Sequence, residues 1–292
     1  MVTIEKLLKD GIEIIKQREF NFPKLDVELI LCYLLKKDRV YLHLNRKEEV
    51  SNDIKEKFYE LIIKRNEGYP LQYITNSQEF MGLEFYVQEG VLIPRPDTET
   101  LVELVINMAK DRFGNQEIKI LDLGAGSGAI GISLAYYLKN SVVTAIDISD
   151  RAVETTKINI EKHNLNNIKV IKGNIFEDTL SGEKYHIVVS NPPYIERDTI
   201  KNLQAEVSSF EPKLALDGGI DGLDYYRPIV EIFNKIHEKD GILAVEIGCE
   251  QKESVEEIFM STKLFKTIKT YKDLSGNNRV VMAYMSSGLA PT

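Results

Sequence analysis

The fold of this chain is decided by the stretch Ile118-Lys119-Ile120-Leu121-Asp122-Leu123-Gly124-Ala125-Gly126-Ser127-Gly128. Its first six residues form an apolar run that predicts a buried strand. The glycines that follow allow a tight turn and a close approach of the backbone to a ligand, and a helix is predicted over residues 129–138. A strand, a glycine-rich turn and a helix in this order are typical of the ligand-binding unit of a doubly wound α/β sheet.

Strands and helices continue to alternate after this unit. A helix is predicted over residues 150–163. Six further strands are predicted over residues 142–146, 168–171, 187–189, 242–247, 266–272 and 279–285. This alternation predicts a mostly parallel, seven-stranded sheet. Only residues 273–278 separate the last two strands, so these strands are expected to form a hairpin with one member antiparallel to the rest.

The first part of the chain has a different pattern. Residues 1–75 show apolar side chains at helical spacing and predict a small helical bundle, with Thr3 and Ser51 as candidate N-caps. The later half of this segment is locally basic, and as a group its cations could face an acidic partner. These cations are Lys36, Lys37, Arg39, Arg46, Lys47, Lys64 and Arg65.

A β-hairpin linker over residues 76–95 is predicted to join the bundle to the α/β domain. Its strands are expected at 79–87 and 91–93, on either side of Gln88-Glu89-Gly90. The α/β domain then occupies residues 96–285. The tail, 286–292, is expected to be disordered or an expression remnant.

The composition, with 43% hydrophobic and 28% charged residues among 292, is that of an ordinary soluble globular protein. There is no apolar run of membrane-spanning length and no signal-peptide pattern, so a cytoplasmic protein without membrane contact is expected. Cys32 and Cys249 lie outside any CxxC pattern and are expected to be reduced. The four histidines show no ligand spacing, so no metal site is expected. A net charge of −8 argues against direct binding to the phosphate backbone of a nucleic acid.

The glycine loop indicates a cofactor that contains adenosine. Gly126, Gly128 and Gly131 fit the dinucleotide pattern. Asp147 ends the next predicted strand, about twenty residues on, where an acid binds ribose hydroxyls. NAD and S-adenosylmethionine both fit this loop. The residues predicted to bind the cofactor here are Gly124, Ala125, Gly126, Ser127, Gly128 and Asp147.

Three features favour S-adenosylmethionine over NAD. Asp122 precedes the glycines, where an acid can hold a cationic amino-acid group and would repel a pyrophosphate. The closing hairpin is typical of the methyltransferase variant of this fold. A proline corner after the fourth strand suits an amine that accepts a methyl group. After the third strand, Asn174 and Ile175 are expected to contact the adenine.

The proline corner is Asn191-Pro192-Pro193-Tyr194. Its two prolines fix two φ angles and remove two N–H donors. The backbone carbonyls, the side-chain oxygen of Asn191 and the ring of Tyr194 suit a planar group that carries an NH2. Taken alone, the stretch is equally consistent with an ordinary turn that closes a strand. Arg95, which lies between two prolines, is a further candidate for substrate contact.

With these features the chain resembles class I methyltransferases that act on planar amines, and more narrowly the release-factor glutamine methyltransferases of the HemK/PrmC group. The resemblance covers most of the chain. It is carried by Pro70-Leu71-Gln72-Tyr73-Ile74, Leu92-Ile93-Pro94-Arg95-Pro96-Asp97-Thr98-Glu99, the glycine loop, Asn191-Pro192-Pro193-Tyr194-Ile195, Glu211-Pro212-Lys213-Leu214-Ala215-Leu216-Asp217-Gly218-Gly219, Asp221-Gly222-Leu223 and Glu246-Ile247-Gly248. The Asn-Pro-Pro-Tyr motif alone is shared with adenine-N6 methyltransferases. Asn174 departs from the family pattern, since relatives often carry Asp there.

The resemblance implies transfer of a methyl group from S-adenosylmethionine to the side-chain nitrogen (N5) of a glutamine. That glutamine belongs to the Gly-Gly-Gln motif of class 1 peptide chain release factors, which act in translation termination. The helical domain would help to bind the factor, and a monomer is expected.

Within this hypothesis Asn191, Pro192 and Tyr194 are catalytic. Oδ1 of Asn191 and the carbonyl of Pro192 accept the two N–H bonds of the glutamine amide, while Tyr194 stacks on its plane. Pro193 and Arg95 complete the substrate site, and Asn191 also borders the cofactor.

Three alternatives stay open on the sequence. Glutamine methylation of a ribosomal protein would use the same corner. Adenine-N6 methylation of nucleic acid is opposed by the acidic net charge. A non-catalytic factor that binds translation proteins through the helical domain is opposed by the intact glycine loop, Asp147 and Asn191.

Overall fold

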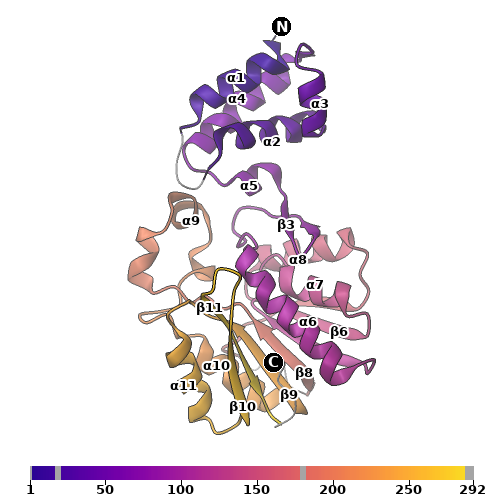
Figure 1. The fold of residues 1–292 in the computed structure, drawn as a ribbon, viewed down its shortest axis with the longest axis vertical. Coiled ribbons are helices and arrows are strands. Elements are labelled where there is room, and N and C mark those ends of the chain that lie inside the picture. The colour runs from indigo at the N-terminus through magenta and orange to yellow at the C-terminus, as the bar shows by residue number, and fades with distance from the viewer. Residues whose placement is uncertain (1, 17–20, 178–181, 287–292) are drawn as a thin grey trace. The chain divides into compact units, whose positions relative to one another are not determined.

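The computed structural model describes residues 2–16, 21–177 and 182–286. The chain forms two compact units (Figure 1). The first comprises Met1–Ser77 together with Asn202–Phe210, and the second comprises Gln78–Lys201 and Glu211–Thr292. The predicted tail lies outside the described residues except for Ser286. No helix in the described ranges is both long enough and apolar enough to cross a membrane.

The first unit is a helical bundle, as the sequence predicts. Its elements are β1 (Val2–Thr3), α1 (Ile4–Ile14), α2 (Pro23–Leu35), α3 (Arg39–Leu44), β2 (Glu49–Val50), α4 (Asn52–Asn66), α5 (Leu71–Thr75) and α9 (Ala205–Phe210). The predicted caps are confirmed, because the side chains of Thr3 and Ser51 accept hydrogen bonds from the first turns of α1 and α4. Gly11 lets α1 approach α2 and α4 closely, since a Cβ there would lie 2.8 Å from Val27 and 2.9 Å from Phe58.

Residues 202–210 return to the helical unit from a distant part of the chain. Nη1 of Arg65 lies 2.7 Å from Oε2 of Glu206, and Nε of Arg65 lies 2.7 Å from Oδ2 of Asp26. The ring of Phe210 packs edge-on against that of Tyr69 at 5.3 Å. Nothing in the sequence pattern indicates this return, because the contacts of Glu206 and Phe210 join residues more than a hundred positions apart.

The second unit is built on a seven-stranded sheet. Its strands in this sheet are β5 (Ile118–Leu123), β6 (Ser141–Asp147), β7 (Ile168–Lys172), β8 (Tyr185–Ser190), β9 (His237–Glu246), β10 (Thr267–Lys272) and β11 (Asn278–Tyr284). The strand order is β10-β11-β9-β8-β5-β6-β7, and β11 is antiparallel to both of its neighbours. The mostly parallel sheet with a closing hairpin is therefore confirmed.

Helices cover both faces of this sheet (Figure 1). They are α6 (Glu99–Phe113), α7 (Ala129–Tyr137), α8 (Asp150–Lys162), α10 (Tyr226–Ile236) and α11 (Lys252–Ser261). Strand β5 shows how the two faces are filled. Ile118 and Ile120 belong to the core with α6 and α7, whereas Leu121 and Leu123 belong to the core with α10 and α11. Because both faces are buried, the strand reads as a continuous apolar run.

The predicted hairpin linker is wrong in detail. The strands are β3 (Gln78–Phe80) and β4 (Leu83–Phe85), and the turn is at Met81-Gly82 instead of 88–90. Met81 and Gly82 both have positive φ, 53° and 70°, as a two-residue turn of this twist requires. The side chain of Glu99 accepts a hydrogen bond from the backbone N–H of Met81 at 2.6 Å.

Residues 91–93 are not a strand. After β4 the backbone is instead hydrogen-bonded to a side chain. Asn159 of α8 accepts a hydrogen bond from the backbone N–H of Tyr86 and donates one to the backbone carbonyl of the same residue. The side-chain amide thus takes the place of a neighbouring strand. A short 3-10 helix, η1 (Pro96–Thr98), then leads into α6; the other 3-10 segments are η2 (Arg197–Asn202) and η3 (Lys213–Ala215).

Candidate functional site

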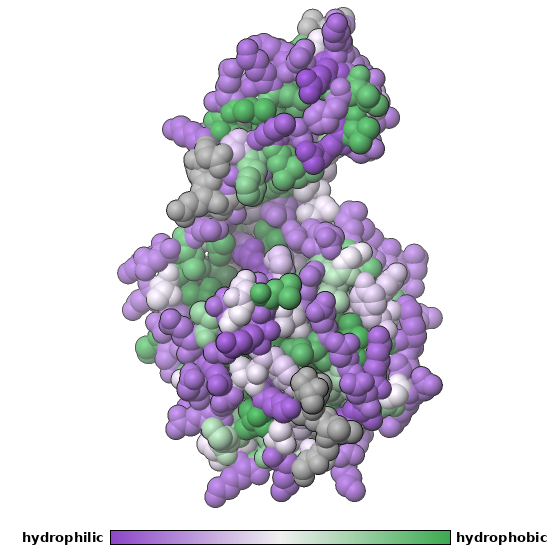
Figure 2. Space-filling model, viewed as in Figure 1, coloured by the Kyte–Doolittle hydropathy of each residue, from purple (hydrophilic) through white to green (hydrophobic). Residues whose placement is uncertain are grey.

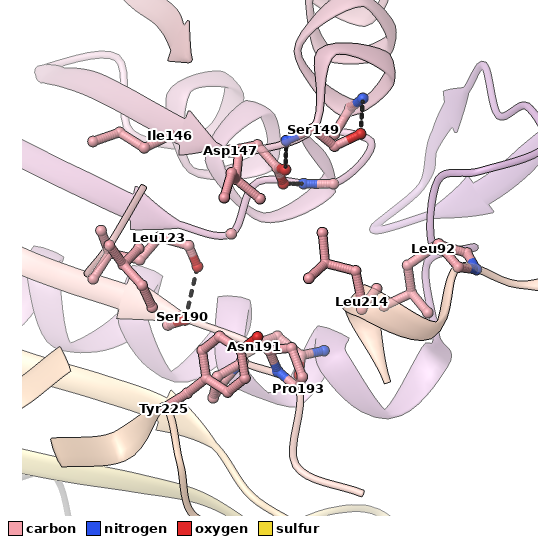
Figure 3. A pocket seen from close by; sticks show the side chains of 18 of the residues that line it. Leu92, Leu123, Ile146, Asp147, Ser149, Ser190, Asn191, Pro193, Leu214 and Tyr225 are labelled. Carbon is pink, nitrogen blue, oxygen red and sulfur yellow. Dashed lines mark hydrogen bonds between the residues drawn. The ribbon is translucent and has the colours of Figure 1, made fainter. Parts of the chain in front are cut away.

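The second unit contains a pocket beyond the carboxyl ends of β5, β6 and β8 (Figure 3). In a parallel sheet this edge is where ligands bind. Asp147 and Ser149 lie on one side, and Asn191, Pro193 and Tyr225 lie on the other. The lining residues include Leu92, Gly124, Gly126, Asp147, Ser149, Gly173, Asn174, Ile175, Phe176, Asn191, Pro192, Pro193, Pro212, Leu214, Ala215 and Tyr225.

The glycine loop forms the floor of this pocket. Gly124 and Gly126 have φ of +79° and +58°, and a Cβ built on either would meet no atom within 4 Å. Their backbone therefore faces open space that a ligand can enter. Gly128 has a packing role instead, because a Cβ there would lie 2.7 Å from Ile132 and 2.8 Å from Thr156.

The neighbouring loop residues, Ala125 and Ser127, are buried and lie outside the pocket lining. Their side chains thus contribute to the loop's shape and not to the pocket surface.

Asp147 connects the glycine loop to the start of α8. Its Oδ2 accepts from the N–H of Gly126 at 2.8 Å, and its Oδ1 accepts from the N–H of Ser149 at 2.9 Å. Burial raises the pKa of this carboxyl, and the hydrogen bonds oppose the shift. The carboxylate lines the pocket, in agreement with a contact to ribose hydroxyls.

Asp122 does not line the pocket. It is fully buried, and its Oδ2 accepts from the N–H of Gly131 at 2.9 Å. Burial raises the pKa of Asp122 to about 7. The sequence predicted that this acid would hold the cationic group of the cofactor, whereas the structure places it behind the loop, where it fixes the first turn of α7.

Asn174 lies in the pocket beside Ile175 and Phe176. Its Oδ1 accepts from the N–H of Phe176 at 3.0 Å, and its Nδ2 donates to Glu177 at 3.2 Å. An aspartate could replace the first of these contacts but not the second. The departure from the family pattern is therefore matched by a local partner for the extra N–H.

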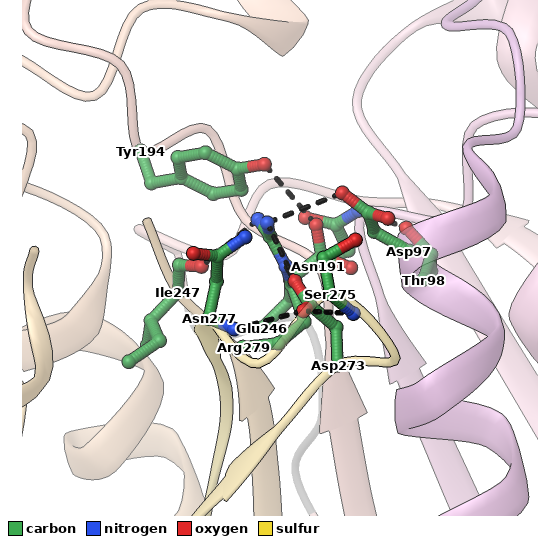
Figure 4. Close-up of polar contacts among 10 residues, drawn as sticks. All are labelled: Asp97, Thr98, Asn191, Tyr194, Glu246, Ile247, Asp273, Ser275, Asn277 and Arg279. Atoms are coloured by element: carbon green, nitrogen blue, oxygen red, sulfur yellow. Dashed lines mark hydrogen bonds and ion pairs between the residues drawn. The ribbon is translucent and has the colours of Figure 1, made fainter. Parts of the chain in front are cut away.

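Asn191 is held through its nitrogen. Nδ2 donates to the hydroxyl of Thr98 at 3.0 Å (Figure 4). This contact leaves Oδ1 to act as an acceptor for a ligand. Pro192 and Pro193 also line the pocket, and the corner begins where the Ser190 hydroxyl donates to the carbonyl of Leu123 at 2.7 Å.

Tyr194 lies behind the corner and outside the pocket lining. Its hydroxyl donates to Oε1 of Glu246 at 3.2 Å, and its backbone carbonyl accepts from Gln251 at 2.9 Å. Burial, together with the nearby Glu246, raises the pKa of Tyr194. The ring therefore supports the corner and is not placed to stack on a ligand in the pocket.

Arg95 is also outside the pocket lining. Its Nη2 lies 2.6 Å from Oε1 of Glu211, a carboxylate whose side chain is 1% exposed. Glu211 directly precedes Pro212, Leu214 and Ala215, which line the pocket. The ion pair therefore anchors the start of this lining segment. A structural role accounts for the position of Arg95 between two prolines.

Several residues of the site were not predicted. Thr98, Glu246 and Leu214 lie within stretches that carried the family resemblance, but their contacts could not be inferred from spacing. Leu92, which lines the pocket, begins one of these stretches too, whereas Tyr225 lines the pocket without any sequence signal. Among the residues that the structure describes, no cluster of three or more His, Cys, Asp or Glu is arranged to hold a metal ion.

Comparison with known proteins agrees with this geometry. A family model described as "Methyltransferase small domain" matches residues 95–209, and one described as "PrmC N-terminal domain" matches residues 6–75. The release factor glutamine methyltransferase of Clostridium acetobutylicum is 41% identical over 96% of this chain and 98% of that protein. That of Clostridium botulinum is 39% identical over the same shares.

This chain belongs to the release factor glutamine methyltransferase family. It is a methyltransferase, and the mostly parallel sheet with a closing hairpin is the class I form of the methyltransferase fold. A methyltransferase from Pyrococcus furiosus shares this fold with a TM-score of 0.52 at 16% identity, covering 82% of this chain and 100% of that one. Membership of the family accounts for the glycine loop, the acid at the end of β6 and the proline corner in one pocket.

Proposed function

We propose that this enzyme transfers the methyl group of S-adenosylmethionine to the side-chain amide nitrogen (N5) of the glutamine in the Gly-Gly-Gln motif of class 1 peptide chain release factors. The observation that carries the proposal is the Asn191-Pro192-Pro193 wall, which lies across the pocket from Asp147 (Figure 3). It offers acceptors and no competing N–H donors from its two prolines. Such a wall recognises an NH2 group attached to a planar carbon.

The residues of the pocket fit S-adenosylmethionine. The backbone at Gly124 and Gly126 faces space that any Cβ would enter, and Asp147 supplies acceptors for ribose hydroxyls. Ile175 and Phe176 supply apolar surface for an adenine. The Asn174 backbone and side chain border the same part of the pocket. When bound, this cofactor supplies an electrophilic methyl group on a sulfonium.

The protein's task is to position a weak nucleophile. The lone pair of a glutamine amide is delocalised into its carbonyl, so the nitrogen attacks only if it is held in line with the methyl group. Oδ1 of Asn191 and the carbonyl of Pro192 accept its two N–H bonds. As the new N–C bond forms, the nitrogen becomes positive and both hydrogen bonds strengthen, which lowers the barrier. The extra proton leaves afterwards to water.

We assign Tyr194 and Arg95 supporting roles in this mechanism. Tyr194 holds the corner from behind through Glu246. Arg95 holds the start of the lining segment Pro212–Ala215 through Glu211. Asp122 acts in the same way on the first turn of α7, through Gly131.

The helical unit is proposed to bind the release factor. Part of its predicted basic group is used inside the unit, because Arg39 pairs with Glu28 at 2.6 Å and Arg65 is buried between Asp26 and Glu206. Exposed cations that border α3 are Lys36, Lys37, Arg46 and Lys47. Val40 and Leu44 on α3 are 63% and 80% exposed. Figure 2 shows apolar side chains beside hydrophilic ones on this unit. Such a mixture is typical of surfaces that bind other proteins.

We further propose that the enzyme works as a monomer in the cytoplasm and does not bind nucleic acid directly. Its net charge of −8 supports the last point.

Incubation with labelled S-adenosylmethionine and a purified class 1 release factor tests the proposal. Label is expected on one peptide, the one that contains Gly-Gly-Gln, and a factor with Gly-Gly-Ala is the matched control. Parallel reactions with ribosomal proteins and with DNA or RNA test the alternatives. Label that stays in the Gly-Gly-Ala factor, or that enters only ribosomal protein or nucleic acid, would refute the assignment.

A further inference from the structure

The proline corner is held at both of its ends. At its start it continues strand β8, whose last residue is Ser190. At its far end the backbone carbonyl of Tyr194 accepts a hydrogen bond from Nε2 of Gln251 at 2.9 Å. The two acceptors assigned to the substrate amide, on Asn191 and Pro192, lie between these points. Their directions therefore depend on the position of Tyr194 as well as on β8.

The Gln251 carboxamide joins four segments of the second unit. Its Nε2 also donates to the backbone carbonyl of Gly222 at 3.2 Å. Its Oε1 accepts from the backbone N–H of Gly248 at 2.9 Å. The same oxygen lies 3.3 Å from the Tyr226 hydroxyl, whose hydrogen is shared with a backbone carbonyl at the end of β9 at 3.1 Å. One side chain thus connects the corner, the loop over residues 217–224, the turn after β9 and the start of α10.

The orientation of this amide is decided by its neighbours. The nitrogen faces two carbonyl oxygens, and the oxygen faces the N–H of Gly248. A flipped amide would set its oxygen against both carbonyls and its NH2 group against a donor. Because only one orientation satisfies these partners, Gln251 holds the Tyr194 carbonyl in one place.

The loop over residues 217–224 packs on the same end of the corner. A Cβ on Gly218 would lie 2.8 Å from the backbone C and Cα of Tyr194. A Cβ on Gly222 would lie 2.4 Å from the Tyr194 carbonyl oxygen and 2.4 Å from Nε2 of Gln251. Glycine at these two positions therefore lets the loop and the amide reach the backbone of the corner.

The prolines narrow the geometry of the corner without fixing it. Asn191 and Pro192 each precede a proline, which confines ψ to a range of about 40°. A carbonyl oxygen lies about 1.1 Å from the Cα–C axis, so a rotation through this range moves it by about 0.7 Å. The contacts that hold Tyr194 select one position within the range.

We propose that Gln251 is a positioning residue for methyl transfer, which fixes the Tyr194 end of the corner and with it the acceptors on Asn191 and Pro192. The inference rests on the proposed function of this site. A weak nucleophile reacts only when it is in line with the methyl group, and a misplacement of about 1 Å can lower a rate about 10²-fold. A shift of the size that the prolines allow is therefore enough to slow the reaction.

The inference gives a role to three glycines that belong to stretches of the family resemblance but lie outside the pocket lining. Gly218 and Gly222 pack on the backbone of Tyr194. Gly248 donates its N–H to Gln251. These stretches meet behind the corner, although they are well separated along the chain.

Asn167 offers a matched control at the opposite edge of the sheet. Its Nδ2 donates to the backbone carbonyls of Ala135 and Ser141 at 2.9 and 3.1 Å, close to the 2.9 and 3.2 Å of Gln251. Ser141 begins β6, whereas the pocket lies beyond the carboxyl end of that strand. Both side chains are half-buried. Loss of either amide removes the same kind of contact, but only Gln251 contacts the corner.

Single-turnover methylation of a class 1 release factor at saturating S-adenosylmethionine, with calorimetric titration of the cofactor, tests the inference. Gln251→Ala removes the whole amide, whereas Gln251→Glu keeps the acceptor for Gly248 and loses both donors. Each should lower the methyl-transfer rate about 10- to 100-fold. Cofactor affinity should stay near wild type, because the glycine loop and Asp147 are unchanged. Asn167→Ala should keep the wild-type rate.

Urea denaturation of the same variants separates positioning from a structural role. Gln251→Ala and Asn167→Ala should both lower the midpoint, since each loses hydrogen bonds to two backbone carbonyls. A loss of rate confined to the Gln251 variants then cannot come from lower stability. If Gln251→Ala does not fold, Gln251→Glu, which has the same shape, carries the test. Wild-type rates in the folded Gln251 variants would overturn the inference, as would equal slowing in Asn167→Ala or a defect that lies wholly in cofactor affinity.

The wild-type reaction keeps this test separate from the proposed function. If the wild type does not methylate the release factor, the proposed substrate is wrong and the inference fails with it. If the wild type does so and the folded Gln251 variants react as fast, the positioning role is wrong and the substrate assignment stands.

Discussion

Asn191→Ala should abolish most of the catalysis and leave cofactor binding intact. The side chain offers one acceptor to a nitrogen that becomes positive as the methyl group arrives. A hydrogen bond to a charged group is worth about 1.5–3 kcal/mol, which corresponds to a rate factor of about 10 to 150. Loss of alignment adds to this, because alanine leaves the amide free to turn out of line.

The expected fall in single-turnover rate is therefore about 10²–10³-fold, the loss seen when one preorganised polar contact to a developing charge is removed. Cofactor affinity should stay close to wild type, since the glycine loop and Asp147 belong to the other side of the pocket (Figure 3). Rapid-quench methylation and calorimetric titration of S-adenosylmethionine measure the two quantities separately. A variant that turns over at nearly the wild-type rate would refute the assignment of Asn191, and so would one whose defect lies wholly in cofactor binding.

Four other changes follow from contacts in the structure. Asp147→Ala should weaken S-adenosylmethionine binding about 10- to 100-fold through loss of charged hydrogen bonds; unchanged calorimetric affinity would contradict this. Gly128→Ala should lower the free energy of unfolding by about 2 kcal/mol or more, because a Cβ there meets side chains at 2.7 Å with φ at +83°; urea denaturation measures it, and an unchanged midpoint would argue against that packing. Arg65→Ala leaves the buried Asp26 carboxylate without its partner at 2.7 Å and should lower the free energy of unfolding by about 3–5 kcal/mol in the same assay. A decrease of only about 0–1 kcal/mol, the value typical of exposed ion pairs, would contradict this. The folded state keeps a proton on Asp122 up to a pKa of about 7, above the ordinary value of 3.8, so its contribution makes the free energy of unfolding fall as pH rises between these values; Asp122→Asn should flatten that slope, and an unaltered slope would rule out a raised pKa.

Much of the fold could be predicted from local patterns. The buried strands of the sheet are continuous apolar runs because helices cover both faces. The caps at Thr3 and Ser51 were correct because an N-cap depends only on residues within one turn. The hairpin near residue 80 was predicted with the wrong turn. Gln88-Glu89-Gly90 has the composition of a turn, but Met81 adopts a positive φ that its residue type does not suggest.

The sequence by itself determined the order of the strands along the chain, the glycine loop, the acid at the end of β6 and the proline corner, because each is set by neighbours within a few residues. Only the tertiary structure decided which of these side chains reach the pocket. Asp122, Tyr194 and Arg95 stand within or next to ligand-binding stretches in the sequence. The polar group of each, however, is hydrogen-bonded to or ion-paired with a buried partner. The physical reason is that a polar atom removed from water must be paired, and its partner here lies 9, 52 or 116 residues away along the chain. Such distances carry no periodic signal, and they become contacts only when the sheet has formed.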